Sequence, residues 1–184
     1  MTARVAKNTR LYDILALLVI IVVISLDQWT KSLVVTSLSP PESRNVPLVG
    51  QYLTLYYIQN SGAAFSMLKN TVVLVVLITI ALLVVGYIYF RVLNSGPLYY
   101  KIIFGLIIGG ALGNVIDRIH NGGYVVDFIW FRIPQLGFSF AIFNIADACI
   151  TVGVVLLFVC IFFLRRAPGE KQIENTSSKT VSNK

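Results

Sequence analysis

Four aspartates lie beside or within apolar segments that are long enough to cross a lipid bilayer. They are Asp27, Asp117, Asp127 and Asp147. A charged side chain at the centre of a membrane helix costs about 2.5–3.5 kcal/mol on insertion scales, so such residues usually face a protein interior or a watery cavity. Two carboxylates in a low-dielectric pocket share a proton, because both cannot ionise easily. One can then take a proton from water while the other protonates a carbonyl oxygen or a leaving amine.

Amide and basic side chains accompany these aspartates at helical spacing. Asn114 lies three residues before Asp117 and four before Arg118, so these three side chains share one face of a helix. Asn144 and Asp147 are likewise three residues apart and lie on one helical turn. Amides can orient a pair of carboxyl groups without adding charge, which makes both asparagines candidates for a supporting role.

The spacing does not by itself decide which two aspartates would act together. Asp27 and Lys31 are four residues apart, which predicts an ion pair within one helix and a structural role. A strand-like loop carries Asp127 between the helices of Asp117 and Asp147. Spacing alone therefore leaves Asp117 and Asp127 as rival partners for Asp147.

Other catalytic chemistries have little support in the chain. It has one histidine, His120, which we expect at a helix end on the surface, and it has neither a P-loop nor a GxSxG motif. Ser61 or Ser66 could in principle pair with Lys31, but nothing in their spacing favours a Ser-Lys dyad. Both cysteines fall in the last apolar segment, where packing is the usual role. We expect no metal ion and no cofactor.

The composition makes this an integral membrane protein. Of the 184 residues, 57% are hydrophobic and 12% are charged, and the mean hydropathy is +0.79. An ordinary soluble domain does not have this composition. The net charge of +7 does not indicate nucleic-acid binding, because the basic residues cluster at segment ends and form no stripe interleaved with aromatic residues.

A membrane-spanning helix needs about 20 mainly apolar residues, and four stretches meet that requirement. They cover residues 12–35, 71–90, 102–119 and 140–164. We therefore predict an α-helical membrane protein with four transmembrane helices in one domain, residues 1–166. External loops are expected at residues 36–70 and 120–139, and a disordered cytoplasmic tail at residues 167–184.

The first stretch also has features of a cleavable signal peptide, because Arg4, Lys7 and Arg10 precede its apolar run. No small-x-small cleavage site follows that run. Instead come Asp27, Lys31 and further apolar residues, which favours a retained membrane anchor.

Charge sets the expected orientation of the four helices. Ten of the fifteen basic residues lie in the N-terminal segment, the second loop and the tail. The positive-inside rule therefore places both termini in the cytoplasm. All four membrane aspartates would then lie toward the external face.

Both external loops contain strand-like segments. Residues 51–58 and 124–133 are rich in aromatic and β-branched residues and are bounded by glycine, asparagine and proline. They predict a small external sheet over the helix ends. The alternative is an aromatic belt at the membrane surface, where such side chains also gather.

Five motifs follow one another along the chain. They are Asp27-x-x-Thr30-Lys31, Asn60-Ser61-Gly62-Ala63-Ala64-Phe65, Gly109-Gly110-x-x-Gly113-Asn114-x-x-Asp117-Arg118, Val125-Val126-Asp127-Phe128 and Phe143-Asn144-x-Ala146-Asp147. In this order they resemble the bacterial lipoprotein signal peptidases, the signal peptidase II family.

The resemblance implies an intramembrane aspartic endopeptidase of the bacterial cytoplasmic membrane. Such an enzyme removes the signal peptide from a prolipoprotein, cutting before a cysteine that carries a diacylglyceryl group. By the family's pattern Asp127 and Asp147 form the catalytic dyad, with Asp117 bracing Arg118. The substrate-binding and supporting residues would be Asp27, Lys31, Asn60, Gly62, Asn114, Asp117, Arg118 and Asn144. We expect a monomer whose partners are lipidated prolipoproteins and membrane lipids, with no nucleic acid.

Two other functions are compatible with parts of the sequence. A small transporter would use membrane carboxylates as proton relays, but it would place them near the midplane or show inverted repeats. A scaffold protein would explain the glycine-rich face around Gly109 and Gly113. It would leave Asp127 and Asp147 without a role.

Overall fold

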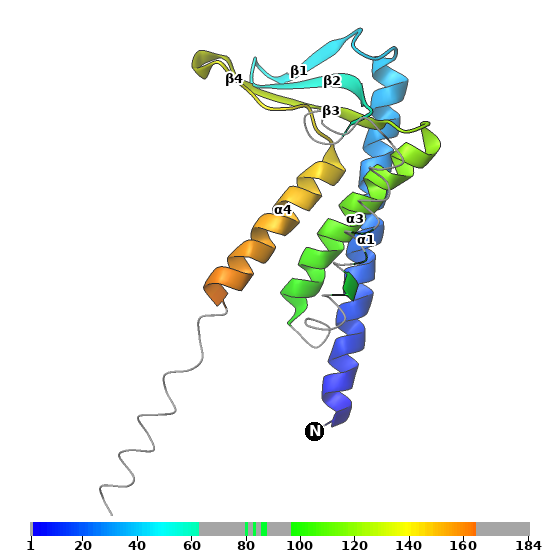
Figure 1. Ribbon diagram of the computed structural model, residues 1–184, viewed down its shortest axis with the longest axis vertical. Helices are drawn as coiled ribbons and strands as arrows, with labels where there is room; N and C mark the ends of the chain where they lie inside the picture. The colour runs from blue at the N-terminus through cyan, green and yellow to red at the C-terminus, as the bar shows by residue number, and fades with distance from the viewer. Residues whose placement is uncertain (1, 63–79, 81–82, 84–85, 88–96, 165–184) are drawn as a thin grey trace, which may run out of the picture.

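The computed structural model describes residues 2–62, 80, 83, 86–87 and 97–164. The described helices are α1 (Thr2–Leu38), α3 (Leu98–His120) and α4 (Ile145–Val159), which continues into a π-helical turn, Cys160–Leu164. In Figure 1, α1 and α3 run side by side, and a small sheet covers the end of the bundle where α1 and α3 finish and α4 starts.

Three of these helical segments are long and apolar enough to cross a membrane within the described part of the chain. They span Arg10–Leu38, Leu98–His120 and Ile145–Phe162. The predicted spans at residues 12–35 and 102–119 are thereby confirmed as apolar helices. The predicted span at residues 71–90 lies largely outside the described residues, and the tail at residues 167–184 lies wholly outside them.

Local sequence signals explain where the helices stop. No glycine or proline interrupts α1, and the helix ends just before the Ser39-Pro40 pair, because a residue that precedes proline disfavours helical geometry. Helix α3 starts directly after Pro97. It ends before Gly122 and Gly123, which both have positive φ angles, +68° and +114°, a conformation that glycine adopts readily.

The sheet has four antiparallel strands in the order β1-β2-β3-β4. They are β1 (Asn45–Val49), β2 (Leu53–Asn60), β3 (Val125–Ile133) and β4 (Phe138–Ser139), with a short 3-10 turn, Pro134–Leu136, before β4. The predicted sheet is confirmed, and its central strands are the two segments that the sequence indicated.

The prediction that the last helix begins at residue 140 is wrong. Residues 140–143 are drawn toward the sheet instead, because Phe140 donates its N–H to the carbonyl of Phe131 at 2.9 Å. Phe143 exchanges backbone hydrogen bonds with Ile129, at 2.8 and 3.1 Å. Helix α4 therefore starts at Ile145, after the cap residue Asn144. Apolar composition alone does not distinguish these residues from a helical turn.

An apolar cluster fixes the sheet to the helices. Val34 and Leu38 at the end of α1 pack against Tyr57 of β2 and against Val126 and Phe128 of β3. All five side chains are buried. This contact places the inner strands β2 and β3 directly over the helix ends.

Glycines let the helices approach closely, as their spacing in α3 indicates. A Cβ on Gly109 would lie 2.9 Å from Val23 Cβ of α1, and one on Gly110 would lie 2.5 Å from the carbonyl oxygen of Ala146. Gly153 of α4 similarly faces Ile107 of α3. Helix α3 is thus packed between the other two helices.

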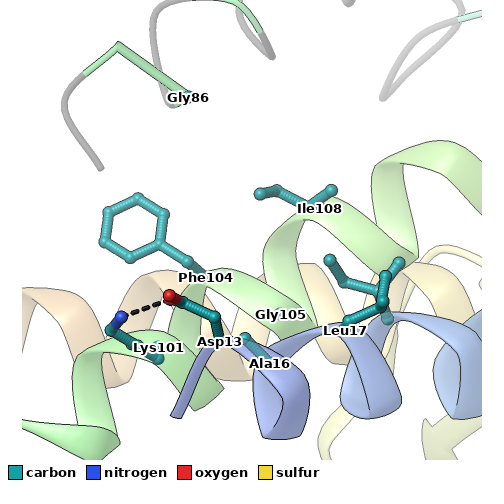
Figure 2. Close-up of a pocket in the computed structure, with 9 residues that line it drawn as sticks. Asp13, Ala16, Leu17, Gly86, Lys101, Phe104, Gly105 and Ile108 are labelled. Atoms are coloured by element: carbon teal, nitrogen blue, oxygen red, sulfur yellow. Dashed lines mark hydrogen bonds and ion pairs between the residues drawn. The ribbon is translucent and has the colours of Figure 1, made fainter. Parts of the chain in front are cut away.

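The far end of the bundle carries a separate ionic contact. Lys101 of α3 is fully buried and contacts the carboxylate of Asp13 in α1. The pair borders a largely apolar cavity of about 280 Å³, which Ala16, Leu17 and Phe104 also line (Figure 2). A second cavity lies beneath the sheet and is described below; the two cavities have no lining residue in common.

Helix packing at Gly110 provides a first test of the fold. Gly110→Ala places a methyl group against the Ala146 carbonyl, so we expect the free energy of unfolding to fall by about 1–3 kcal/mol. Thermal unfolding in detergent measures this change. The matched control is Gly86→Ala, where no atom of the described residues lies within 4 Å of an added Cβ. Equal melting temperatures for the two variants would contradict the close α3–α4 contact.

Candidate active site

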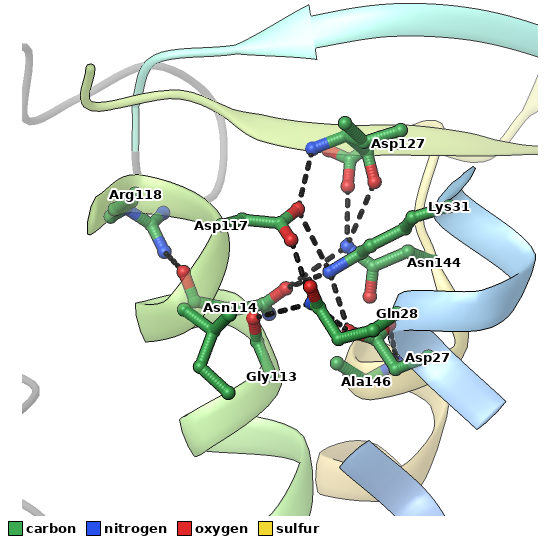
Figure 3. Close-up of polar contacts among 12 residues, drawn as sticks. Asp27, Gln28, Lys31, Gly113, Asn114, Asp117, Arg118, Asp127, Asn144 and Ala146 are labelled. Carbon is green, nitrogen blue, oxygen red and sulfur yellow. Dashed lines mark hydrogen bonds and ion pairs between the residues drawn. The ribbon is translucent and has the colours of Figure 1, made fainter. Parts of the chain in front are cut away.

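The structure brings all four aspartates together beneath the sheet. Figure 3 shows Asp27, Asp117 and Asp127, and Asp147 joins them through its hydrogen bonds with Asn114 and Asn144. Asp27 comes from α1, Asp117 from α3, Asp127 from β3 and Asp147 from the first turn of α4. Their side chains belong to one continuous hydrogen-bonded network. The network has two parts: an ion-pair cluster around Lys31, and a pair of carboxyl groups held by asparagines.

The ion-pair cluster contains two carboxylates and one ammonium group. Lys31 Nζ lies 2.8 Å from Asp27 Oδ2 and 3.0 Å from Asp117 Oδ2. The predicted pairing of Asp27 with Lys31 is confirmed. All three side chains are at most 4% exposed, so each charge depends on the others for compensation.

The same carboxylates fasten neighbouring elements to the cluster. Asp27 Oδ1 accepts a hydrogen bond from the backbone N–H of Ala146 in α4 at 3.0 Å. Asp117 Oδ2 accepts one from the N–H of Val126 in β3 at 2.9 Å. A Cβ on Gly113 would lie 2.6 Å from Asp27 Oδ2, so only glycine leaves room for this carboxylate. The cluster therefore joins α1, α3, α4 and β3.

No direct ion pair joins Arg118 to Asp117 among the described residues, so the bracing of Arg118 by Asp117 stays a prediction. Its guanidinium donates to the carbonyl of Asn114 at 3.1 Å and to the carbonyl of Gly62 at 3.3 Å. Adjacent residues on a helix do not face one another, and Asp117 points toward Lys31 instead. The Nε atom of Arg118 is buried and has no hydrogen-bond partner among the described residues.

Asp127 is held by two amide groups. Its Oδ2 accepts from Asn60 Nδ2 at 2.8 Å, and its Oδ1 accepts from Asn144 Nδ2 at 2.7 Å. The residue is only 1% exposed. Burial, and secondarily the negative charge of Asp147, raise the pKa of Asp127 to about 7, against the opposing effect of these amides and Lys31.

Asp147 is placed by the start of α4. Its backbone N–H donates to Asn144 Oδ1 at 2.9 Å, while its Oδ2 accepts from the N–H of Asn144 at 3.3 Å. This reciprocal arrangement is a capping box. Its other oxygen, Oδ1, accepts from Asn114 Nδ2 at 2.7 Å. Asn144 therefore contacts both Asp127 and Asp147.

A cavity of about 330 Å³ adjoins the two carboxyl groups. Its polar wall is formed by Asn60, Gly62, Asn114, Arg118, Asp127 and Asp147. Its other wall is formed by Val125, residues 140–143, Ile150 and Thr151 and is mainly apolar. Every other site residue predicted from the sequence lines this cavity or belongs to the Lys31 cluster, whereas Asn144 lies behind the cavity wall and contacts Asp127, Asp147 and Asn114. Among the described residues, no group of three or more His, Cys, Asp or Glu side chains is arranged to hold a metal ion.

Sequence reasoning missed Gln28. Its Nε2 lies 2.8 Å from Asp117 Oδ1 and 3.2 Å from both Asp27 Oδ2 and the carbonyl oxygen of Gly113. The available signal was its place inside the Asp27-x-x-Thr30-Lys31 motif, three residues before Lys31 and on the same helical face.

Comparison with known proteins gives a consistent family. A family model described as signal peptidase (SPase) II matches residues 19–163. A lipoprotein signal peptidase of Anoxybacillus flavithermus is 42% identical, over 83% of this chain and 86% of that protein. One from Mesorhizobium japonicum is 44% identical, over 76% of this chain and 80% of that protein.

A solved structure has the same fold. It is described as a bacterial membrane enzyme and superposes with a TM-score of 0.76 at 29% sequence identity. The match covers 86% of this chain and 93% of that chain.

The ion-pair cluster predicts a large effect of removing its cation. Lys31→Met leaves two buried carboxylates unpaired, so we expect the free energy of unfolding to fall by about 3–5 kcal/mol, measured as a lower melting temperature in detergent. Adding Asp117→Asn should restore part of the loss. Arg44→Met, at an exposed position, is the control. A melting temperature for Lys31→Met like that of this control would contradict the cluster's role.

Proposed function

This chain belongs to the signal peptidase II family of aspartic peptidases, and from that membership we propose that it removes signal peptides from diacylglyceryl-modified prolipoproteins. The cut would fall just before the lipidated cysteine, with Asp127 and Asp147 activating a water molecule. The observation that carries this proposal is the pairing of these two residues. They line one cavity, and Asn144 contacts both.

Asp127 is the carboxyl group that starts protonated in this proposal. It is the more deeply buried of the two, and its pKa of about 7 lets it keep a proton at neutral pH. Asp147 is partly exposed to the cavity and starts as the carboxylate. The single proton of the pair is then on the group that must donate it.

The reaction proceeds in two steps. The Asp147 carboxylate takes a proton from water as the water oxygen attacks the scissile carbonyl carbon, and Asp127 gives its proton to the carbonyl oxygen. A tetrahedral diol results. Asp147 then protonates the leaving nitrogen as the C–N bond breaks, and a diol hydroxyl returns its proton to Asp127. Both carboxyl groups end in their starting states.

The other polar residues would hold the reactants in place. Asn60, Asn114 and Asn144 donate to the dyad and so fix its oxygens. Arg118 and Gly62 form the remaining polar wall, where the guanidinium can meet a substrate carbonyl. Asp27, Lys31 and Asp117 would act one layer behind, by fixing the helices that carry the dyad.

The apolar wall and the sheet would receive the substrate. Phe140, Ile142 and Ile150 offer an apolar surface to the lipid and signal-peptide side chains. The extended segment around the scissile bond could add to an edge of the sheet by backbone hydrogen bonding. The scissile bond of a substrate anchored in the bilayer would thus lie at the same membrane depth as the dyad.

Membrane placement is part of the same proposal. Four transmembrane helices in one peptidase domain, residues 1–166, and a cytoplasmic tail, residues 167–184, would give both termini a cytoplasmic location. The sheet and the dyad would then lie at the external face of the bacterial cytoplasmic membrane, in a monomer. The three apolar helices and the excess of basic residues near the termini support this arrangement.

Replacing either dyad residue tests the proposed reaction. Asp127→Asn and Asp147→Asn should each reduce cleavage of a lipidated prolipoprotein by at least about a thousandfold, because an amide can neither take water's proton nor donate as an acid. Mass spectrometry of the products measures cleavage by the purified variants. Glu42→Gln, at an exposed position outside the network, is the matched control and should cleave normally. Near-normal cleavage by either dyad variant would remove it from the reaction.

The raised pKa of Asp127 predicts how the reaction depends on pH. The acid must be protonated, so kcat/KM should fall as the pH rises through about 7. At lower pH the rate should fall again once the pair gains a second proton, which gives a bell-shaped profile with apparent pKa values of the pair. A kcat/KM value that stays constant across the neutral and alkaline range would contradict an Asp127 acid.

A further inference from the structure

Gln28 occupies a position that the proposed reaction does not use directly. It lies on α1 and is half-buried against α3. Its amide nitrogen reaches Asp117 Oδ1, Asp27 Oδ2 and the carbonyl oxygen of Gly113, at 2.8, 3.2 and 3.2 Å (Figure 3). All three neighbours are acceptors, so the donor end of the amide faces them and its two N–H groups are shared among the three.

The charge of the cluster gives this amide a specific task. Asp27 and Asp117 carry two negative charges, while Lys31 supplies one positive charge between them. Like charges repel strongly where water is excluded. Gln28 is an uncharged donor to both carboxylates: it contacts Asp117 at Oδ1, while Lys31 contacts Oδ2, and it contacts Asp27 at Oδ2, the oxygen that Lys31 also contacts. It therefore holds both groups in place without adding a second cation.

Lys31 transmits this placement to the dyad. Its third contact is Asn114 Oδ1, at 3.0 Å. A lysine ammonium only donates, so the oxygen of the Asn114 amide must face it, and the nitrogen must face the other way. That nitrogen donates to Asp147 Oδ1 at 2.7 Å. Asn144 Nδ2 also donates to Asn114 Oδ1, at 3.1 Å. Lys31 and Asn144 together therefore determine which end of the Asn114 amide reaches Asp147.

We propose that Gln28 is a positioning residue for the peptidase reaction. Its amide fixes the two carboxylates on Lys31, and Lys31 thereby keeps the Asn114 donor against Asp147. This inference rests on the proposed function. A residue that only packed α1 against α3 would affect stability, whereas a positioning residue changes the rate of the chemical step in folded enzyme.

Gln28→Met keeps the length of the side chain and removes its donor. We expect kcat for a lipidated prolipoprotein, per folded enzyme, to fall between about tenfold and about a hundredfold, with KM nearly unchanged. Val23→Ala is the control for packing, because Val23 contacts Gly109 in the same helix pair and lies outside the polar network. It should lower the melting temperature but leave kcat within about twofold of wild type.

Gln28→Glu tests the hydrogen-bond donor at nearly constant side-chain shape, because pH controls whether the introduced carboxyl group can donate. The side chain borders a cavity of about 200 Å³ that Lys31, Asp117 and His120 also line. An introduced carboxyl group donates one hydrogen bond when protonated, but repels Asp27 and Asp117 when ionised. The ratio of its kcat to that of wild type should therefore fall as the pH rises. The titratable groups that contact Gln28 or line this cavity with it are Asp27 and Lys31 of α1 and Asp117 and His120 of α3. Asp147 of α4 and Asp127 of β3 lie farther along the network, beyond Asn114 and Asn144.

The outcomes separate this inference from the proposed function. Wild-type protein that cannot cleave the lipidated substrate overturns the proposed function itself. If wild type cleaves, a kcat for Gln28→Met within about twofold of wild type, or a change in KM alone, overturns the role of Gln28. If Gln28→Met does not fold, Gln28→Glu decides alone: a kcat ratio that is independent of pH overturns the inference, and a falling ratio supports it.

Discussion

A single buried ammonium group, that of Lys31, holds the functional end of this protein together. Its contacts with Asp27 and Asp117 are worth little as a simple sum, because taking charges out of water costs several kcal/mol for each ion. Their main effect is to connect separate helices and a strand. The two carboxylates also accept hydrogen bonds from the backbone of α4, from the backbone of β3 and from Gln28. Four elements from distant parts of the chain therefore meet at one point.

The network treats its four carboxyl groups in two physically different ways. Asp27 and Asp117 both contact the Lys31 ammonium, at 2.8 and 3.0 Å. Asp127 and Asp147 accept hydrogen bonds from asparagine amides instead, and in our proposal they share one proton. Asn114 stands at the boundary, because its oxygen faces Lys31 and its nitrogen faces Asp147. The Lys31 ion-pair cluster and the proposed catalytic carboxyl groups are thus adjacent but distinct.

Much of this arrangement can be predicted from the sequence, because several signals are local. The apolar lengths predict the membrane-spanning parts of α1 and α3, and the four-residue spacing predicts the Asp27–Lys31 pair. The start of α4 is not set by a local signal. Residues 140–143 are apolar enough for a helix, but backbone groups of Phe140 and Phe143 form hydrogen bonds with β3. The contacts of Gln28 were not predicted for a similar reason, since its acceptors lie mostly on another helix. Our proposal of Asp127 rather than Asp117 as the partner of Asp147 is supported by tertiary contacts rather than by spacing, because Asp117 forms an ion pair with Lys31.

The shared proton is the central claim, and infrared spectroscopy tests it most directly. A protonated, buried carboxyl group absorbs separately from a carboxylate, so its band can be followed in purified protein as the pH changes. A shared-proton dyad predicts a protonated carboxyl band in wild type that disappears as the pH rises through about 7, and that is missing in Asp127→Asn. A wild-type protein without this band below neutral pH, or a band that Asp127→Asn leaves unchanged, would contradict it.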